Sequence, residues 1–287
     1  MKTIDTLVDD ILKVVDTGGG WDSTVSSYLS TKLKDTLDNR LTTKEEDYKP
    51  TLRMSNIGSP CHRKLWYSLN LPLSSEPLRA ETKLKFLYGD ILEDLLLTLA
   101  KAAGHQVEGE QDVLELNGIK GRRDAVIDGV TVDVKSTSTA SFKKFRDHGL
   151  REDDPFGYIQ QLSSYVYAAK DDPLVLDKTK GAFLAIDKQN GTVCLDVYDF
   201  TEEFKTKEVY IETVKAMAIL PKPPARAFSP EPEGKSGNMK LPMECSYCDF
   251  KWECHPGLRG FIYAGGRPTY LTKVVVTPRV PEIERKT

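Results

Sequence analysis

The chain has 287 residues, of which 39% are hydrophobic and 29% charged, and its formal net charge at pH 7 is −3. This length allows one large domain or two ordinary ones around a sizeable core. The near-neutral charge gives no overall basic signature of nucleic-acid binding, so any DNA-binding face is expected to be local. No run of about 18 apolar residues is present, and the acidic start MKTIDTLVDD is unlike a signal peptide, so we expect a soluble protein in the cytoplasm.

The start of the chain carries two amphipathic segments. Apolar residues recur at helical spacing through residues 1–16, glycines at 18–20 end that pattern, and a second one runs through 25–41. We therefore expect an N-terminal helical extension over residues 1–50 that packs on the rest of the chain or contacts a partner. The charged stretch 42–50 reads as a linker.

The middle of the chain alternates helix and strand patterns, which predicts a mixed α/β core. After it, the proline-rich stretch that starts at Leu220 reads as a loop, and the end of the chain reads as an irregular tail over 261–287. The predicted core elements are a long helix over 81–104, a hairpin over 121–136, a helix over 156–170, strands over 181–187 and 191–200, and a helix over 201–219.

The sequence GRRDAVIDGVTVDVKS at 121–136 predicts a tight β-hairpin. Its two apolar-alternating runs are joined by Asp128-Gly129, a pair typical of the type I′ turn, in which both central residues have positive φ. This turn fixes the register, so that Ile127 faces Val130.

The same register places two acids opposite each other. Asp124 lies directly across from Asp133, and Lys135 shares their face because side chains alternate along a strand. Like charges in directly opposed positions are destabilising, so a positive charge is expected between them. A divalent cation such as Mg²⁺ fits, since it is held by one or two carboxylates plus waters and phosphate oxygens. The alternative is an exposed hairpin face with solvated acids and Lys135 as a partial counter-charge.

Two further helical pairs could belong to the same site. Gly89 inside the long helix needs a reason, such as the close approach of another backbone, and Glu93 follows one turn later. Glu93 could complete a metal site or be an exposed acid. Gln161 and Tyr165 share a helix face and could hold a phosphate or a water, although Tyr165 could equally be core.

The ordered set GxxxE, D, DxK and QxxxY resembles the PD-(D/E)XK nuclease superfamily, specifically its RecB-like branch. The resemblance implies a restriction-endonuclease-like core, a central mixed β-sheet flanked by helices. Many RecB-like members carry histidine where Glu93 stands, which makes the metal preference less certain than the fold. The resemblance also implies an Mg²⁺ or Mn²⁺ ion bound by Glu93, Asp124, Asp133 and the carbonyl of Val134. In such a site Lys135 positions the attacking water or helps to deprotonate it. Gln161 and Tyr165 orient the phosphate or the lysine.

Four of the five cysteines suggest a second metal centre. Cys245, Cys248 and Cys254 form C-x₂-C-x₅-C, and Cys61 lies far upstream. Four thiolates bind zinc or an iron-sulfur cluster, although zinc sites usually show two close pairs. His62 and His255 adjoin these cysteines and could substitute for them.

The arrangement of the cysteines, one before the nuclease motifs and three after them, resembles that of the iron-staple nucleases. These include the CRISPR-associated RecB-like exonucleases and the AddB nuclease domain. This resemblance covers roughly residues 53–256 and implies a 4Fe-4S cluster that joins the N- and C-terminal segments of a nuclease domain over 51–260. Zinc stays the alternative. Cys194 alternates with apolar residues and is expected to be a buried strand thiol.

Six basic residues and one serine near these motifs are candidates for DNA-backbone contacts, because phosphate contacts supply affinity without sequence specificity. Trp66 and Tyr67 could stack on bases or, as we favour, pack around the cluster. The candidate DNA-binding residues are Arg53, Ser55, Arg63, Lys64, Lys143, Lys144 and Arg146.

The resemblance implies a metal-dependent DNA exonuclease that acts on single- or double-stranded ends in recombination, repair or replication, beside recombination or replication proteins. By analogy, phage-encoded recombination nucleases have this single-module layout. The sequence holds no P-loop GxxxxGK[ST] for a helicase motor. The alternatives are a non-catalytic DNA-end-binding or assembly module with a structural cluster, and a zinc-stabilised regulatory protein.

Overall fold

The computed structural model describes residues 2–42, 51–71, 80–264, 266 and 268–283. Apart from Thr42, the predicted linker 42–50 lies outside these residues. The chain forms two compact units, the first made of Met1–Gly58 and Pro72–Thr213 and the second of Ser59–Leu71 and Val214–Thr287. No helix in the described ranges combines the length and apolarity needed to cross a bilayer.

A mixed five-stranded sheet is the centre of the first unit, as expected. Its strand order is β1-β4-β5-β6-β7, with β5 and β6 parallel and the other neighbouring pairs antiparallel. The strands are β1 (Val107–Glu108), β4 (Ala125–Ile127), β5 (Val130–Thr137), β6 (Lys180–Asp187) and β7 (Val193–Asp199).

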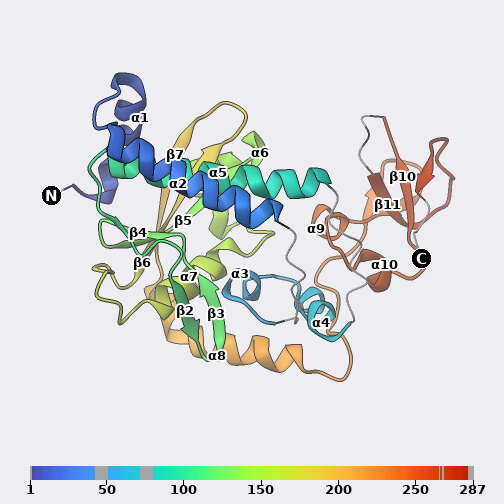
Figure 1. Cartoon of the computed structure of the whole chain (residues 1–287). Helices are drawn as coiled ribbons and strands as arrows, with labels where there is room; N and C mark the ends of the chain where they lie inside the picture. Colours follow the sequence, from blue (N-terminus) through green and yellow to red (C-terminus); the bar gives the residue numbers. More distant parts are fainter. Residues whose placement is uncertain (1, 43–50, 72–79, 265, 267, 284–287) are drawn as a thin grey trace. The chain divides into compact units, whose positions relative to one another are not determined.

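Helices cover both faces of this sheet, and α2 lies along α5 (Figure 1). Apolar side chains of α1 and α5 join one core cluster with the sheet, and those of α6 and α7 join another. The predicted helices are confirmed, whereas α3 and α6 were not predicted. The elements are η1 (Ile4–Thr6), α1 (Leu7–Thr17), α2 (Ser23–Leu41), α3 (Met54–Ile57), α5 (Ala80–Ala102), α6 (Thr139–Arg146), η2 (Gly149–Arg151), α7 (Tyr158–Ala168) and α8 (Thr201–Ala218).

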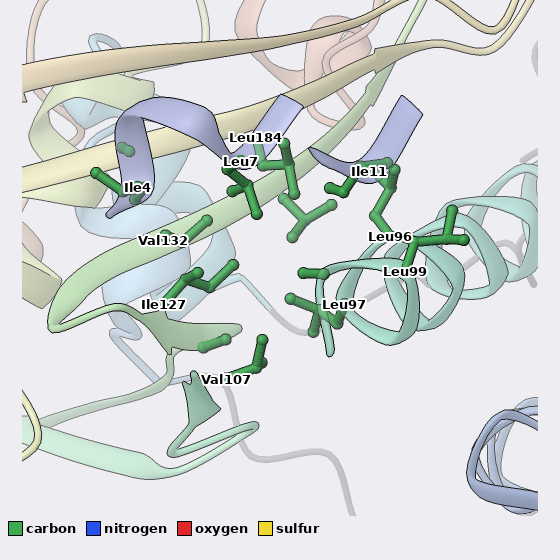
Figure 2. Packing of buried hydrophobic residues seen from close by; sticks show 14 of the residues in the cluster. Ile4, Leu7, Ile11, Leu96, Leu97, Leu99, Val107, Ile127, Val132 and Leu184 are labelled. Atoms are coloured by element: carbon green, nitrogen blue, oxygen red, sulfur yellow. The ribbon is translucent and has the colours of Figure 1, made fainter. Parts of the chain in front are cut away.

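The first core cluster holds α1 and α5 against the sheet. Figure 2 shows Leu7 and Ile11 of α1 beside Leu96 of α5 and the strand residues Val132 and Leu184. Fully burying a side chain of this kind stabilises a fold by roughly 1.5–3 kcal/mol. Part of the N-terminal extension is therefore integral to the core of the first unit.

A second hairpin, β2 (Val113–Leu116) and β3 (Ile119–Arg122), was missed by the sequence analysis. Its turn is Asn117-Gly118, with φ of 50° and 82°. Asn-Gly between alternating runs is a strong hairpin signal, so this strand pair could have been predicted.

The second unit contains a five-stranded antiparallel sheet with the order β12-β10-β11-β9-β8. The prediction of an irregular tail is therefore wrong. Phe261 and Leu271 are buried there, while Pro232 sits on the edge strand β8, where a missing N–H does no harm. The elements are α4 (His62–Asn70), β8 (Glu231–Glu233), β9 (Asn238–Lys240), α9 (Met243–Ser246), α10 (Lys251–Cys254), β10 (Arg259–Ile262), β11 (Pro268–Lys273) and β12 (Glu282–Ile283).

Candidate active site

The β4–β5 hairpin has the predicted register. Ile127 pairs with Val130, and Ala125 pairs with Val132. Asp128 and Gly129 at the turn both have positive φ, 49° and 82°. The hairpin prediction is confirmed.

The register places Asp124, the residue before β4, opposite Asp133 of β5. Val132 and Val134 point into the core shared with α1 and α5, so Asp133 and Lys135 face the other side of the sheet, where α7 packs. Two acids and a lysine are thus gathered on one face of one hairpin.

Asp133 is almost completely buried, with 4% of the residue exposed. Its Oδ2 forms an ion pair with Lys135 Nζ, and its Oδ1 accepts a hydrogen bond of 3.4 Å from Gln161 Nε2. Apart from this ion pair, Oδ2 has no hydrogen-bond partner within the described residues. A buried carboxylate with spare acceptor capacity suits a cation ligand.

The Lys135 ammonium stays charged. Burial acts to lower the pKa of Lys135, but the carboxylates of Asp133 and Asp124 outweigh it and raise that pKa. The ammonium also lies 5.1 Å from the ring centroid of Tyr158. Lys135 is thus held as a cation at the floor of the site.

Asp124 is half-buried, and its Oδ2 accepts a hydrogen bond of 2.7 Å from the Val134 backbone N–H. Burial raises the pKa of the Asp124 carboxyl, and the nearby Asp133 raises it further, against the opposing effects of Lys135 and the Val134 N–H. Ionisation of Asp124 beside Asp133 is therefore unfavourable, and an added cation would favour it.

Glu93 of α5 completes the group of carboxylates. Burial raises the pKa of Glu93, and Asp124 and Asp133 add to that shift. Its Oε1 accepts a hydrogen bond of 2.6 Å from Gln111 Nε2. Gln111 was missed by the sequence analysis, since a lone glutamine in the loop GEQD gives no signal of its own.

The acids next to Glu93 have other partners. Asp90 forms an ion pair with Arg40, and Asp94 accepts a hydrogen bond of 2.6 Å from Thr36, both on α2. The pKa of Glu93 is raised by both hairpin carboxylates, and Asp90 has a smaller effect on the pKa of Asp124.

Gln161 and Tyr165 of α7 lie over the same face. Gln161 contacts Asp133, while Tyr165 is buried, and burial together with Asp133 and Asp124 raises the pKa of its phenol. Both residues thus adjoin the carboxylates, as predicted.

The three carboxylates supply the oxygen ligands that Mg²⁺ and Mn²⁺ prefer. Their oxygens presently meet Lys135, Gln111 and the Val134 N–H. In the part of the chain that the structure describes, no three His, Cys, Asp or Glu side chains are arranged as a finished metal site. This set of oxygen donors suits a dication, and the neutral donors Gln111 and Val134 each hold one carboxylate oxygen, of Glu93 and of Asp124.

The predicted DNA contacts of the first unit lie on α3 and α6. Arg53 and Ser55 are exposed at the start of α3, and Lys143 is exposed on α6. Lys144 already forms an ion pair with Asp153, and Arg146 forms one with Asp147.

The other predicted DNA contacts lie on α4 in the second unit. Arg63 donates a hydrogen bond of 2.7 Å to the Pro224 carbonyl, and Lys64 is exposed. Tyr67 is buried and stacks on Phe250 with 5.6 Å between ring centroids, so it packs inside the unit rather than on bases.

The four predicted cluster cysteines line one cavity within the second unit. Burial raises the pKa of Cys245 to about 12, with further contributions from Cys248, Cys61 and Cys254. As at the carboxylates, the described side chains are not arranged as a finished metal site. Cys194 lies half-buried on β7 and packs on the core. The cavity is lined by Cys61, Cys245, Cys248, Cys254, Arg63, Lys64, Lys251, His255, Tyr67, Phe228 and Glu244.

Comparison with known proteins gives one family. The family model described as the PD-(D/E)XK nuclease superfamily matches residues 57–255. No curated protein matches the chain. Among solved structures, one titled "Crystal structure of SSO0001" is similar at 19% sequence identity and a TM-score of 0.40, covering 79% of this chain and 95% of its own.

Proposed function

The chain belongs to the PD-(D/E)XK nuclease superfamily, and from this premise we propose that it is a metal-dependent deoxyribonuclease, an exonuclease rather than an endonuclease. The observation that carries the proposal is the meeting of Glu93, Asp124 and Asp133 beside the charged Lys135. Nucleases of this superfamily generally use Mg²⁺ or Mn²⁺.

Glu93, Asp124, Asp133 and the carbonyl of Val134 would hold the metal ion. A bound dication polarises the phosphate and lowers the pKa of a coordinated water. The raised pKa values of Glu93 and Asp124 support this assignment, because an added dication relieves the repulsion that causes part of each shift.

The protein's own residues would arrange the substrate. Lys135 holds a positive charge where the scissile phosphate would lie, so it offsets phosphate charge and orients the attacking water by hydrogen bonding. Gln161 fixes the orientation of Asp133, and Tyr165 contributes a phenol that keeps its proton and can donate to a phosphate oxygen.

DNA is the proposed substrate, in recombination, repair or replication. Lys143 offers an exposed cation on α6, and Arg53 and Ser55 lie at the start of α3. Such residues would supply backbone contacts without base specificity. These contacts fit an enzyme that degrades from an end regardless of sequence.

We further propose that Cys61, Cys245, Cys248 and Cys254 hold a 4Fe-4S cluster, with zinc as the alternative metal. The four thiols line one cavity, although they come from distant parts of the chain. Arg63 Nε and His255 Nε2, from the same lining, are buried and have no hydrogen-bond partner among the described residues. Such donors suit the sulfur acceptors of a cluster.

The proposed activity is tested with purified protein and end-labelled single- and double-stranded DNA in Mg²⁺, Mn²⁺ or chelator. We expect metal-dependent release of short products from linear DNA, no cutting of closed circles, and loss of activity in Lys135→Ala. Lys205→Ala, an exposed lysine paired with Glu202, is the matched control and keeps activity. Stable DNA-end binding without cleavage under every condition would instead identify a non-catalytic module.

A further inference from the structure

Gln111 has a backbone conformation that its residue type rarely adopts. It lies in the loop 109–112 between β1 and β2 with φ of 58°, in the left-handed region. Non-glycine residues avoid this region, and Asn and Asp enter it more readily than Gln. Residues held in such conformations cost of order 1 kcal/mol or more and cluster at functional sites.

This conformation lets one residue bridge two segments that carry the site. The Gln111 backbone N–H donates to the Asp124 carbonyl at 3.2 Å, and its side-chain amide donates to Glu93 Oε1 at 2.6 Å. Glu93 is on α5 and Asp124 precedes β4, so the loop joins the helix to the hairpin through Gln111.

The chemistry of the side chain matters as much as its position. An amide N–H fixes one oxygen of a carboxylate without bringing a positive charge that would compete with a dication. Lys135, by contrast, brings a full charge to Asp133. The hydrogen bond to Oε1 leaves the other oxygen of Glu93 available, and metal-bound carboxylates are typically oriented by such outer partners.

We propose that Gln111 is a positioning residue that orients the Glu93 carboxylate for the metal ion, and that its left-handed backbone is retained because the amide must reach Glu93. This inference rests on the proposed function, since it takes Glu93 as a metal ligand. It predicts that a substitution at Gln111 can keep the loop stable and still weaken the binding of metal.

Two substitutions separate them. Gln111→Gly removes the amide and suits a positive φ, and Gln111→Asn also suits a positive φ but shortens the side chain by one methylene. Both variants are expected to unfold at the wild-type temperature or above it without metal. Both should nevertheless bind Mn²⁺ roughly 10–100-fold more weakly, the usual effect of losing an outer-shell partner.

The experiment is isothermal titration with Mn²⁺ on the full chain, together with thermal unfolding in chelator. Asn117→Gly is the matched control, since Asn117 also has a positive φ, 50°, in the neighbouring β2–β3 turn, and its Mn²⁺ affinity should be unchanged. Glu93→Ala gives the Mn²⁺ affinity to be expected when the proposed metal ligand itself is removed.

The outcomes distinguish the two proposals. If the wild type binds Mn²⁺, Glu93→Ala binds it weakly and both Gln111 variants bind like the wild type, the role of Gln111 is overturned and the metal site stands. If the wild type binds no Mn²⁺, or Glu93→Ala binds it equally well, both proposals are wrong. A loss of stability that parallels the loss of affinity would show Gln111 to be merely structural.

Discussion

The backbone N–H of Val134 donates a hydrogen bond to the Asp124 carboxylate at 2.7 Å, across the hairpin that also carries Asp133. Asp124 is thus held in place by β5, the strand that also carries Asp133. Because this donor is neutral, the anchoring leaves most of the repulsion between the two carboxylates in place.

Asp124→Asn should separate the structural and metal-binding roles of this position. The amide oxygen can still accept from Val134, while the repulsion with Asp133 and Glu93 disappears. We expect the metal-free variant to unfold at or a few degrees above the wild-type temperature, at roughly 2–4 °C per kcal/mol for a unit of this size. Thermal unfolding should show that Mn²⁺ raises the wild-type midpoint but not that of the variant. An equal rise in both proteins would contradict Asp124 as a ligand.

Gly89→Ala should be tolerated. The sequence analysis expected another backbone close to Gly89. Outside the helix itself, however, the nearest described atom to an added Cβ is Ser136 Oγ at 3.4 Å, so that expectation is wrong. Alanine in a helix interior is favoured over glycine by roughly 0.5–1 kcal/mol, which urea unfolding should reveal as added stability. A variant that unfolds at a lower urea concentration than the wild type would show that the Ser136 side chain cannot move away from the added Cβ. A stable variant with weakened DNA cleavage would indicate that substrate approaches this position.

Gly121→Ala should disturb the site through Tyr165. An added Cβ would lie 2.6 Å from Met54 Cβ and 2.9 Å from the Tyr165 hydroxyl. Overpacking of this kind typically costs about 1–3 kcal/mol, and here it should lower both stability and cleavage. Gly118→Ala is the control, because its Cβ would meet no described atom within 4 Å and its strain arises from φ of 82°. Comparable loss of cleavage in both variants, measured where both are fully folded, would argue against a role for Tyr165.

Because of Lys207, the stability of the folded protein should depend on pH. Its side chain is buried and donates to Ser163 and Gln160 of α7, and burial lowers its pKa from 10.5 to about 8. Between these pH values the unfolded chain binds more protons than the folded chain, so wild-type stability should rise with pH from about 8 toward 10.5. The gain relative to Lys207→Met should approach roughly 3 kcal/mol at most, from 1.36 kcal/mol per pKa unit.

Urea unfolding of wild type and Lys207→Met at several pH values between 7 and 10.5 measures this difference. Lys205→Met, at an exposed position of the same helix, is the control substitution. A wild-type advantage that falls as pH rises would have the wrong sign and would contradict a buried, proton-losing Lys207.

The four-cysteine proposal predicts a coloured protein. Anaerobically purified wild type should be brown, absorb visible light and contain about four irons per chain. Cys61→Ser should lose colour and iron, whereas Cys194→Ser, the matched control on β7, should keep both. A colourless protein that contains zinc would select the zinc alternative, and a metal-free protein with a fully folded second unit would refute both.

The hairpin could be predicted in detail because one dipeptide determines its turn, and side-chain alternation then determines every facing pair. Asn117-Gly118 carried the same signal and was overlooked. The sheet of the second unit was harder to predict, because its strands are short and prolines lie within and between them. Gln111 could not be predicted at all, since its contact with Glu93 depends on a loop conformation that no local pattern specifies.

The second unit includes Ser59–Leu71, with Cys61, a segment that precedes every strand of the first unit's sheet. During synthesis this segment leaves the ribosome long before residues 214–283, with which it folds. Chains emerge at about 5–20 residues per second, so α4 waits on the order of ten seconds for the rest of its unit. By then every strand of the first unit's sheet has been synthesised. The cysteine-lined cavity therefore cannot assemble until Cys245, Cys248 and Cys254 have emerged, long after Cys61.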